Sequence, residues 1–298
     1  MLGGQTQDVG GLNHKTSYDY TLPLLGVSSI KAPNGVFTYF NYDGFGRFKN
    51  MLDHNGNILK ENAYSYPNRS VTEWMPRTEL TTISASTSAM NALKTVSFVD
   101  GLGRDLQKII VKGSPDSTRD IVASHVVYNT VGRPFKSYLP SPSPSVGGSL
   151  VSWANLKTAA NTFYNDTIPY NETTAFDNSP LNRPITNFGA GNAWRIANKS
   201  MGMQYGVAPA NTIKRFKASL NAVFCNVEGQ ATTIDYYGAN ELQKKISTSE
   251  RGKTVTEYVD LQGRVVQREV EVSADTILTT AYCFDLFDRL AYVIPPNA

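Results

Sequence analysis

The sequence predicts a mainly all-β fold of antiparallel hairpins with a small helical insertion. Three observations support this class. A short motif recurs along the chain, the segments beside it are rich in aromatic and β-branched residues, and turn signals follow one another closely from residue 33 to residue 57. Turns about every ten residues are typical of antiparallel chains, and aromatic and β-branched residues favour strands.

The recurring motif consists of an apolar or aromatic residue, an aspartate or asparagine, two further residues, a glycine and an arginine. The acidic or amide side chain accepts hydrogen bonds from the backbone amides that follow it, which starts a turn. The glycine supplies the positive φ that the turn needs. We interpret the motif residues as structural, with arginines that ladder against neighbouring hairpins. The clearest copies contain Tyr42, Asp43, Gly46 and Arg47; Asp100, Gly103 and Arg104; Asn129, Gly132 and Arg133; and Asp260, Gly263 and Arg264, while a last copy, Asp285 to Arg289, has Asp288 in place of glycine.

The motif and its surroundings resemble a known family. Gly35, the Tyr42–Arg47 motif and Asn55-Gly56 are similar to one full tyrosine-aspartate (YD) repeat of Rhs-type proteins. The later part resembles the Rhs-associated region of large Bacteroidetes proteins, on the segments Asp100–Arg104, Ser137–Pro140, Asn178–Arg183, Gly191–Trp194 and Tyr237–Leu242. The resemblance covers nearly all of residues 31–298 and marks the chain as a fragment of a larger one. It implies a β-sheet shell, often built around a C-terminal toxin, with no chemistry of its own here.

The chain divides into five segments. They are residues 1–66, an N-terminal stretch and YD-repeat hairpins; 67–90, a connector; 91–139, further hairpins; 140–245, an insertion with one helix and long loops; and 246–298, again hairpins. Prolines and a Ser/Thr run favour a loop in the connector. Residues 1–20 are expected to be poorly ordered or to form a detached edge strand.

The insertion differs in its periodicity. Trp153, Leu156, Ala160 and Phe163 have helical spacing, which predicts an amphipathic helix of about 14 residues. Ser149 or Ser152 is the expected N-cap. Residues 178–194 are expected to form a long structured loop that is anchored by Trp194.

Charge and composition narrow the possible partners. The net charge is +3 and no run of lysine and arginine exists, so the sequence does not favour nucleic-acid binding. Neither a signal peptide nor an apolar run long enough to span a membrane is visible in this fragment. By the resemblance, the partners are neighbouring repeats and the C-terminal domain of the parent chain, and the parent is secreted or on the cell surface.

No metal, cofactor or catalytic residue is predicted. Asp53 to Asn57 has the oxygen ligands of a short calcium turn but lacks the downstream bidentate acid. His14, His54 and His125 lie far apart, with no second ligand at zinc spacing. Cys225 and Cys283 either pair or remain two buried thiols.

Three functional hypotheses follow. The first is a structural segment of a shell that encases or displays a C-terminal effector or toxin domain. The second is a cell-surface carbohydrate-binding or adhesion module, because stacked tyrosines hold sugars as well as stabilise sheets. It would use the 178–194 loop or the tyrosine-lined face of the strands, which contains Tyr39, Tyr42, Tyr64, Tyr66, Tyr236, Tyr237, Tyr258 and Tyr282. The third is a hydrolase with a pair of acids in a cleft, and nothing in the sequence marks out such a pair.

Overall fold

The computed structural model describes residues 3–9, 12–20, 26–84, 87–88, 90–220, 225–228, 235–285 and 287–296, and for 3–9, 12–14, 217–220 and 225–228 only their backbone. Strands make up 47% of the structure and helices 7%, which confirms the mainly antiparallel β class with a small helical part. The chain forms two compact units, Met1–Tyr170 and Asn171–Ala298.

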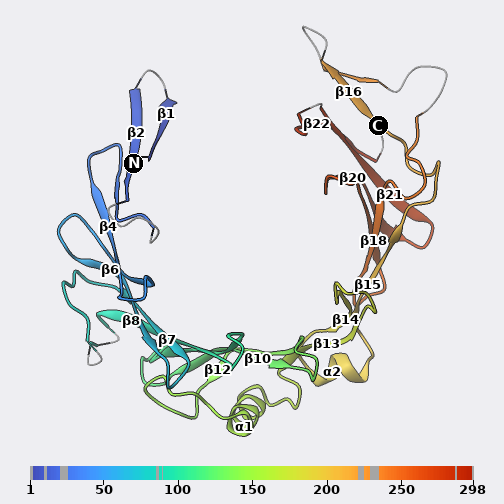
Figure 1. The fold of residues 1–298 in the computed structure, drawn as a ribbon. Coiled ribbons are helices and arrows are strands. Elements are labelled where there is room, and N and C mark those ends of the chain that lie inside the picture. The colour runs from blue at the N-terminus through green and yellow to red at the C-terminus, as the bar shows by residue number, and fades with distance from the viewer. Residues whose placement is uncertain are drawn as a thin grey trace. The chain divides into compact units, whose positions relative to one another are not determined.

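The first unit is an antiparallel ladder (Figure 1). Each strand from β1 to β11 pairs with the next, and β12 continues the line of β11 along β10. Its strands are β1 (Gly3–Val9), β2 (Leu12–Asp19), β3 (Ser29–Lys31), β4 (Phe37–Tyr42), β5 (Phe48–Leu52), β6 (Ile58–Ser65), β7 (Ser70–Pro76), β8 (Ala92–Val99), β9 (Asp105–Val111), β10 (Ile121–Tyr128), β11 (Pro134–Tyr138) and β12 (Ser141–Pro142), and its helix is α1 (Trp153–Tyr164).

The second unit is also built of antiparallel pairs. The ladder runs β13–β14–β15, leaves the sheet for an excursion, and resumes as β18–β19–β20–β21–β22. Its elements are β13 (Tyr170–Phe176), β14 (Pro184–Phe188), α2 (Asn192–Ile196), β15 (Met201–Val207), β16 (Lys217–Leu220), β17 (Cys225–Glu228), β18 (Gln243–Thr248), β19 (Thr254–Val259), β20 (Val265–Ser273), β21 (Thr276–Phe284) and β22 (Leu290–Ile294). Within the excursion, β16 and β17 pair as a separate hairpin.

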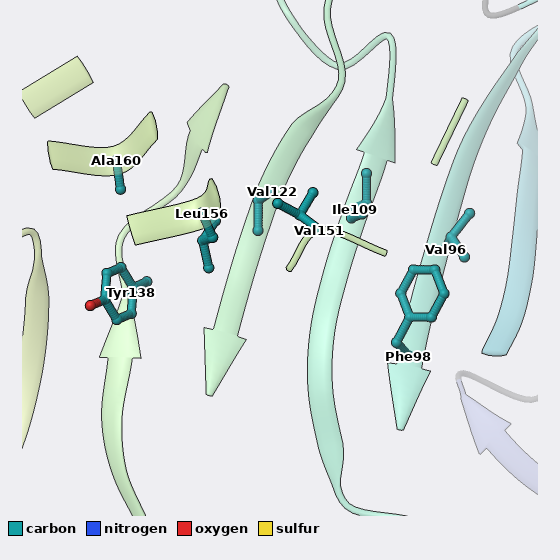
Figure 2. Close-up of a cluster of buried hydrophobic side chains, with 8 residues drawn as sticks. All are labelled: Val96, Phe98, Ile109, Val122, Tyr138, Val151, Leu156 and Ala160. Atoms are coloured by element: carbon teal, nitrogen blue, oxygen red, sulfur yellow. The ribbon is translucent and has the colours of Figure 1, made fainter. Parts of the chain in front are cut away.

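The core of the first unit lies where the insertion covers one face of β8 to β11 (Figure 2). Alternate strand residues point to the same side of a pleated sheet, so Val96 of β8 and Ile109 of β9 face the insertion together. Leu156 and Ala160 are four residues apart on one side of α1, and both are fully buried. Burial of this apolar area holds the helix on the sheet.

Two polar side chains also fasten the insertion. Gln107 of β9 is buried; its amide oxygen accepts from the Val151 N–H at 2.9 Å and its amide nitrogen donates to the Val151 carbonyl at 3.3 Å. Asp120 is 2% exposed, and its two carboxylate oxygens accept from the N–H groups of Lys112 and Gly148 at 2.8 and 2.7 Å. Buried backbone donors need such partners, so these side chains supply the hydrogen bonds that a neighbouring strand would otherwise provide.

A smaller core forms in the second unit. The excursion between β15 and β18 contributes Ala208, Ile213 and Leu242, which pack with Tyr258 of β19 and Val266 of β20. This cluster anchors the excursion to the sheet, as α1 anchors the insertion in the first unit.

Several expectations need correction. The expected connector at residues 67–90 contains β7, which pairs with β8 along its whole length and with β6 over Ser70 to Trp74. Pro76 is tolerated because it ends the strand. The expected loop at residues 178–194 contains β14 and the start of α2, and Trp194 is 45% exposed rather than a buried anchor. At the N-terminus, β1 and β2 form a hairpin that pairs with β3.

The helix prediction is close to the structure. Helix α1 has 12 residues, and the Asn155 N–H donates to the Ser152 side chain at 3.4 Å. Ser152 rather than Ser149 is therefore the N-cap. Asn165 ends the helix in the left-handed conformation, with φ 48°.

We expect Asp120→Ala to lower the free energy of unfolding by about 3 kcal/mol, because the buried Gly148 N–H and the partly buried Lys112 N–H lose their acceptor. Chemical denaturation of the chain measures this. Asp105→Ala is the matched control, since Asp105 is an exposed aspartate on the neighbouring strand and should change stability little. Equal losses in the two variants would contradict the role of Asp120.

A second prediction concerns His125, which is 6% exposed, stacks on Trp153 at 5.5 Å and has a pKa lowered by burial to about 4. The unfolded chain takes up this proton below about pH 6.5, whereas the folded chain resists it until about pH 4. The free energy of unfolding should therefore fall by about 3 kcal/mol between these values, at roughly 1.4 kcal/mol per pKa unit.

Denaturation at a series of pH values tests this expectation. His125→Gln should remove the fall, and His54→Gln, which alters an exposed histidine, should retain it. A wild-type stability that stays flat between pH 4 and 6.5 would refute the prediction.

Candidate functional site

The aspartate–arginine turns are the most regular feature of the chain, and Asp43 shows how they are built. Its backbone N–H donates to the Arg47 carbonyl at 2.8 Å, and its carbonyl accepts from the Gly46 N–H at 2.9 Å. One carboxylate oxygen accepts from the N–H groups of Phe45 and Arg47 at 2.9 and 3.0 Å. The other accepts from Nε and Nη2 of Arg47 at 2.8 and 2.5 Å. One side chain thus satisfies the loop amides and fixes the arginine.

Three other turns repeat this geometry. Asp100–Arg104 and Asp260–Arg264 have the same backbone bonds, with Nε–Oδ2 distances of 2.7 Å in both. Asp285–Arg289 follows them at 2.8 Å. In Asn129–Arg133 the single amide oxygen accepts from the N–H groups of Val131 and Arg133, so this turn keeps the loop but not the aspartate–arginine ion pair.

The glycine of the motif sits in the left-handed region. Its φ is 75° at Gly46, 77° at Gly103, 82° at Gly132 and 83° at Gly263. Asp288 takes the same place with φ 62°, because aspartate tolerates this conformation better than most residues. The strand register shifts just before the residue that precedes each motif aspartate or asparagine, so each loop is a type I turn followed by a bulge.

The ion pairs shift the acid–base properties of their members. Hydrogen bonds from Arg47 hold the pKa of Asp43 below its ordinary value, and those from Arg104 do the same for Asp100. The backbone N–H of Arg289 is the main cause of the lowered pKa of Asp285. Aspartate in turn raises the pKa of Arg264. The pairs therefore remain ionised around neutral pH.

Three of the motif arginines, Arg47, Arg104 and Arg264, also reach the following turn. In the first unit, four turns lie along the same edge of the sheet because the ladder is antiparallel. They are the turns at residues 43–47, 66–69, 100–104 and 129–133. Arg47 lies 3.9 Å from the Tyr64 ring centroid and donates to the Tyr66 hydroxyl at 2.8 Å. Arg104 lies 4.1 Å from the Tyr128 ring and donates to the Gly132 carbonyl at 3.0 Å.

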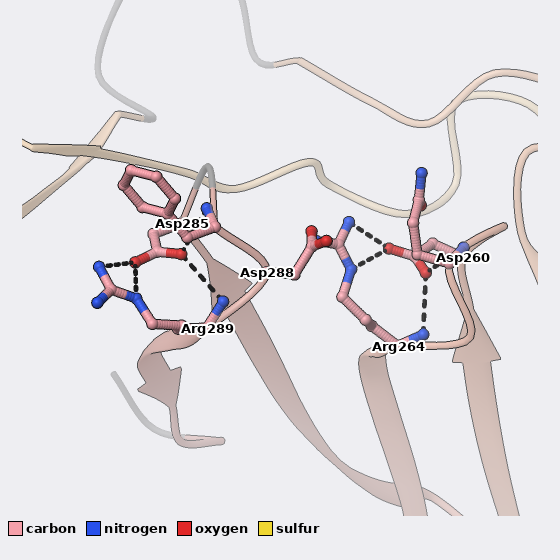
Figure 3. A network of polar contacts seen from close by, with 7 residues as sticks. Asp260, Arg264, Asp285, Asp288 and Arg289 are labelled. Atoms are coloured by element: carbon pink, nitrogen blue, oxygen red, sulfur yellow. Dashed lines mark hydrogen bonds and ion pairs between the residues drawn. The ribbon is translucent and has the colours of Figure 1, made fainter. Parts of the chain in front are cut away.

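The second unit repeats the arrangement (Figure 3). Arg264 contacts the Phe284 ring at 4.9 Å, and its Nη1 donates to a carboxylate oxygen of Asp288 at 2.5 Å. Asp288, which replaces the motif glycine, is therefore a second carboxylate that pairs with Arg264. The expected laddering of arginines corresponds to these contacts.

The sequence reasoning missed one turn of this class. Arg183 donates from its backbone N–H and from Nε to the Asp177 carboxylate at 2.9 and 2.6 Å and lies 4.0 Å from the Tyr205 ring. The loop is two residues longer than the motif, and Asn182, with φ 50°, takes the place of glycine. The signal was an Asn-Arg pair that follows an aspartate, once a longer loop is allowed.

The candidate calcium turn is closed by its own residues. The Asp53 carboxylate accepts from the N–H groups of Asn55 and Asn57 and from the Asn57 side chain. Within the described residues, no three His, Cys, Asp or Glu side chains lie together as metal ligands. His54 is exposed and His125 is buried, whereas the side chain of His14 is outside the described part. Cys283 is buried in β21, and the side chain of Cys225 is outside that part too.

Tyr237, named above as a sugar-stacking candidate, packs against the core of the second unit, and the Arg215 guanidinium lies 4.5 Å from its ring. Burial raises its pKa. Arg215 is paired with Glu241, which also accepts from the Gly238 N–H at 2.7 Å. The ring is thus engaged in packing. In the described part of the chain, no helix is long and apolar enough to cross a membrane.

Comparisons with known proteins bear on the fold of the chain. A family described as Domain of unknown function (DUF6443) matches residues 72–207. The structure is similar to the crystal structure of TcdB2-TccC3, an Rhs/YD-repeat shell, with a TM-score of 0.51 and 12% identity over 96% of this chain and 14% of that one. The chain has an Rhs-like fold.

A second structure, TcdB2-TccC3-Cdc42, gives a TM-score of 0.50 with 11% identity over 96% of this chain and 17% of that one. The Rhs-like segment described here therefore spans less than a fifth of the length of either structure. No curated protein matches the sequence. The DUF6443 match runs from β7 to β15 and includes α1 and the turns at Asp100 and Asn129.

We expect Gly103→Ala to destabilise the chain by about 1 kcal/mol, because a Cβ at φ 77° strains the backbone. The cost is conformational, since a Cβ at this position meets no atom within 4 Å. Gly103→Asn is the matched control and should cost less, because asparagine tolerates the left-handed region. Denaturation of both variants measures the difference, and equal costs would contradict the argument.

Proposed function

We propose that this chain is a structural segment of an Rhs/YD-repeat shell that encases or displays a C-terminal effector or toxin domain of its parent chain. The parent is a larger, Bacteroidetes-type protein that is secreted or exposed at the cell surface. The segment itself performs no catalysis, and its partners are neighbouring repeats and the C-terminal domain.

One observation carries the proposal: the turns are joined to one another as well as closed within themselves. Arg47, Arg104 and Arg264 each bind their own aspartate and then contact the next turn. A hairpin stack held only by its strands twists and frays at the loops. Cross-turn contacts at the loop ends make the ladder suited to a continuous wall, and the fold similarity to TcdB2-TccC3 supports the same role.

The charged groups of the motif are already paired and hydrogen-bonded, which supports a structural role rather than a catalytic one. The motif aspartates accept from loop amides and from arginine, and their lowered pKa values keep them from acting as acids at neutral pH. The mechanism we propose is steric: a closed sheet keeps a downstream segment away from proteases until it is released.

A carbohydrate-binding or adhesion module is the alternative function. Two of its features are less well supported, because Tyr237 packs against the core and the 178–194 segment contains a strand and a helix start. This alternative predicts saturable glycan binding by the chain alone that is lost in Tyr236→Ala and Tyr237→Ala.

Protease protection of the full parent chain, tagged at its extreme C-terminus, tests the shell function. We expect the tagged segment to survive as a discrete band under conditions that digest the same segment expressed alone. A variant with Gly103→Val and Gly263→Val should lose this protection, because valine is a poor residue at φ 77° and 83°.

The matched control carries Gly44→Ala and Gly189→Ala. Neither glycine has a positive φ, and a Cβ at either meets no atom within 4 Å, so protection should persist. If the tag is removed from the wild-type parent as fast as from the isolated segment, the chain does not enclose it and the shell function is wrong.

A further inference from the structure

A hollow of about 690 Å³ lies on the sheet of the first unit, beside the edge of the insertion. Its floor is formed by β7 and β8, one wall by residues 147–150 of the insertion, and one end by the turn at residues 66–69. Small-molecule sites commonly have volumes of about 300–1,000 Å³, so the hollow has the size of such a site.

The strand register determines what the floor presents. Ser70 is opposite Phe98, Thr72 is opposite Val96, and Lys94 follows on the same face two residues before Val96. These side chains share one face of the sheet. The insertion covers the same face over β9 and β10 but stops short of β7, and the step between covered and uncovered sheet forms the hollow.

Arg69 at the end of the hollow has an unusual backbone. Its φ is 48°, in the left-handed region that favours glycine and asparagine. Its N–H donates to the Tyr66 carbonyl at 3.1 Å, and its carbonyl accepts from the Val99 N–H at 2.9 Å, so the turn and β8 hold the residue in place. Turn chemistry accounts for a glycine here but not for an arginine.

The side chain of Arg69 is available to a ligand. Nη1 of Arg69 extends over the next turn, 3.5 Å from the position that a Cβ on Gly101 would take. Among the residues that the structure describes, the side chains of Arg69, Ser70 and Thr72 have no hydrogen-bond partner. Lys94 has only the Trp74 ring, 5.9 Å from its Nζ. The hollow thus presents a guanidinium, an ammonium and two hydroxyls.

The charge of the hollow is positive. Asp100 lines it, but this carboxylate is paired with Arg104 at 2.6 Å and bonded to the loop amides. Arg69 and Lys94 are therefore not neutralised. Guanidinium and ammonium groups bind carboxylate and phosphate oxygens strongly in such settings. Leu106 and Leu150 line the same hollow and offer apolar surface next to these cations.

We propose that this hollow is a binding site for a small organic anion with a carboxylate or phosphate head group and an apolar body. The head group lies against Arg69 and the Ser70 hydroxyl at the turn end of the hollow, Thr72 and Lys94 lie further along the floor, where Lys94 adds positive charge, and the apolar body lies against Leu150. This site is additional to the shell function, and its test does not depend on encapsulation.

Titration of the chain with three small molecules, followed by NMR or calorimetry, tests the site. The molecules are 4-phenylbutyrate, phenyl phosphate and the neutral 4-phenyl-1-butanol. We expect saturable binding of at least one anion, at least roughly tenfold tighter than the neutral compound. The tighter of the two anions identifies the preferred head group.

Variants connect the binding to the hollow. Arg69→Gln and Lys94→Gln should each weaken anion binding by roughly tenfold, and Leu150→Asp should abolish it by placing a like charge against the ligand. Arg119→Gln, at an exposed arginine outside the hollow, is the matched control and should bind as the wild type does. Unchanged thermal unfolding shows that each variant remains folded.

The proposal is overturned if neither anion saturates below about 10 mM, at which binding is too weak to be specific. It is also overturned if the neutral compound binds as tightly as the anions, or if the Arg69→Gln, Lys94→Gln double variant binds like the wild type.

Discussion

Each aspartate–arginine hairpin depends on the hydrogen bonds that a single carboxylate accepts in its loop. Without it, the loop would leave several backbone N–H groups unpaired where two strands meet. In the first copy Asp43 accepts from two of these groups, and its second oxygen holds Arg47. The glycine that follows allows the chain to reverse within the loop. Asp100, Asp260 and Asp285 accept from their loop amides and hold their arginines in the same way, with Asp288 in the glycine place of the last copy, so one local solution closes hairpins in both units.

The arginine extends this local solution to its neighbours. A carboxylate can orient a guanidinium in only a few ways, so a bidentate pair fixes the direction in which the remaining N–H groups point. Those groups meet a hydroxyl at Tyr66, a carbonyl at Gly132 and a carboxylate at Asp288. The acceptors differ chemically but occupy the same place relative to the preceding turn. Aromatic rings beneath the guanidinium complete the contact, and lysine would fill this role poorly because it lacks a planar group.

The insertion shows how such a ladder is thickened. A single sheet layer buries little, and the hydrophobic cluster of the first unit forms where α1 and residues 147–151 lie on the sheet. Apolar packing holds the helix, while Gln107 and Asp120 bind the loop that leads into it. The loop fits closely, because a Cβ on Gly148 would come within 2.8 Å of Val96 and Val111. Where this cover ends, the uncovered sheet and the last covered residues leave the hollow in which Arg69 and Lys94 lie.

The sequence by itself determined the β class, the position of the short turns and the helix, because each depends on residues within a few positions of one another. Of the two candidate caps, Ser149 and Ser152, the structure selected Ser152. Asp43, Gly46 and Arg47 close their loop by local chemistry wherever the hairpin lies. The tertiary structure decided the rest. It determined that residues 70–76 form a strand between β6 and β8, that Asp177 pairs with Arg183 across a longer loop, and that His125 is buried. It also decided that Arg104 binds Gly132 and that Arg69 faces an open hollow. These contacts join residues that only strand register brings together, and register depends on the packing of a whole sheet face.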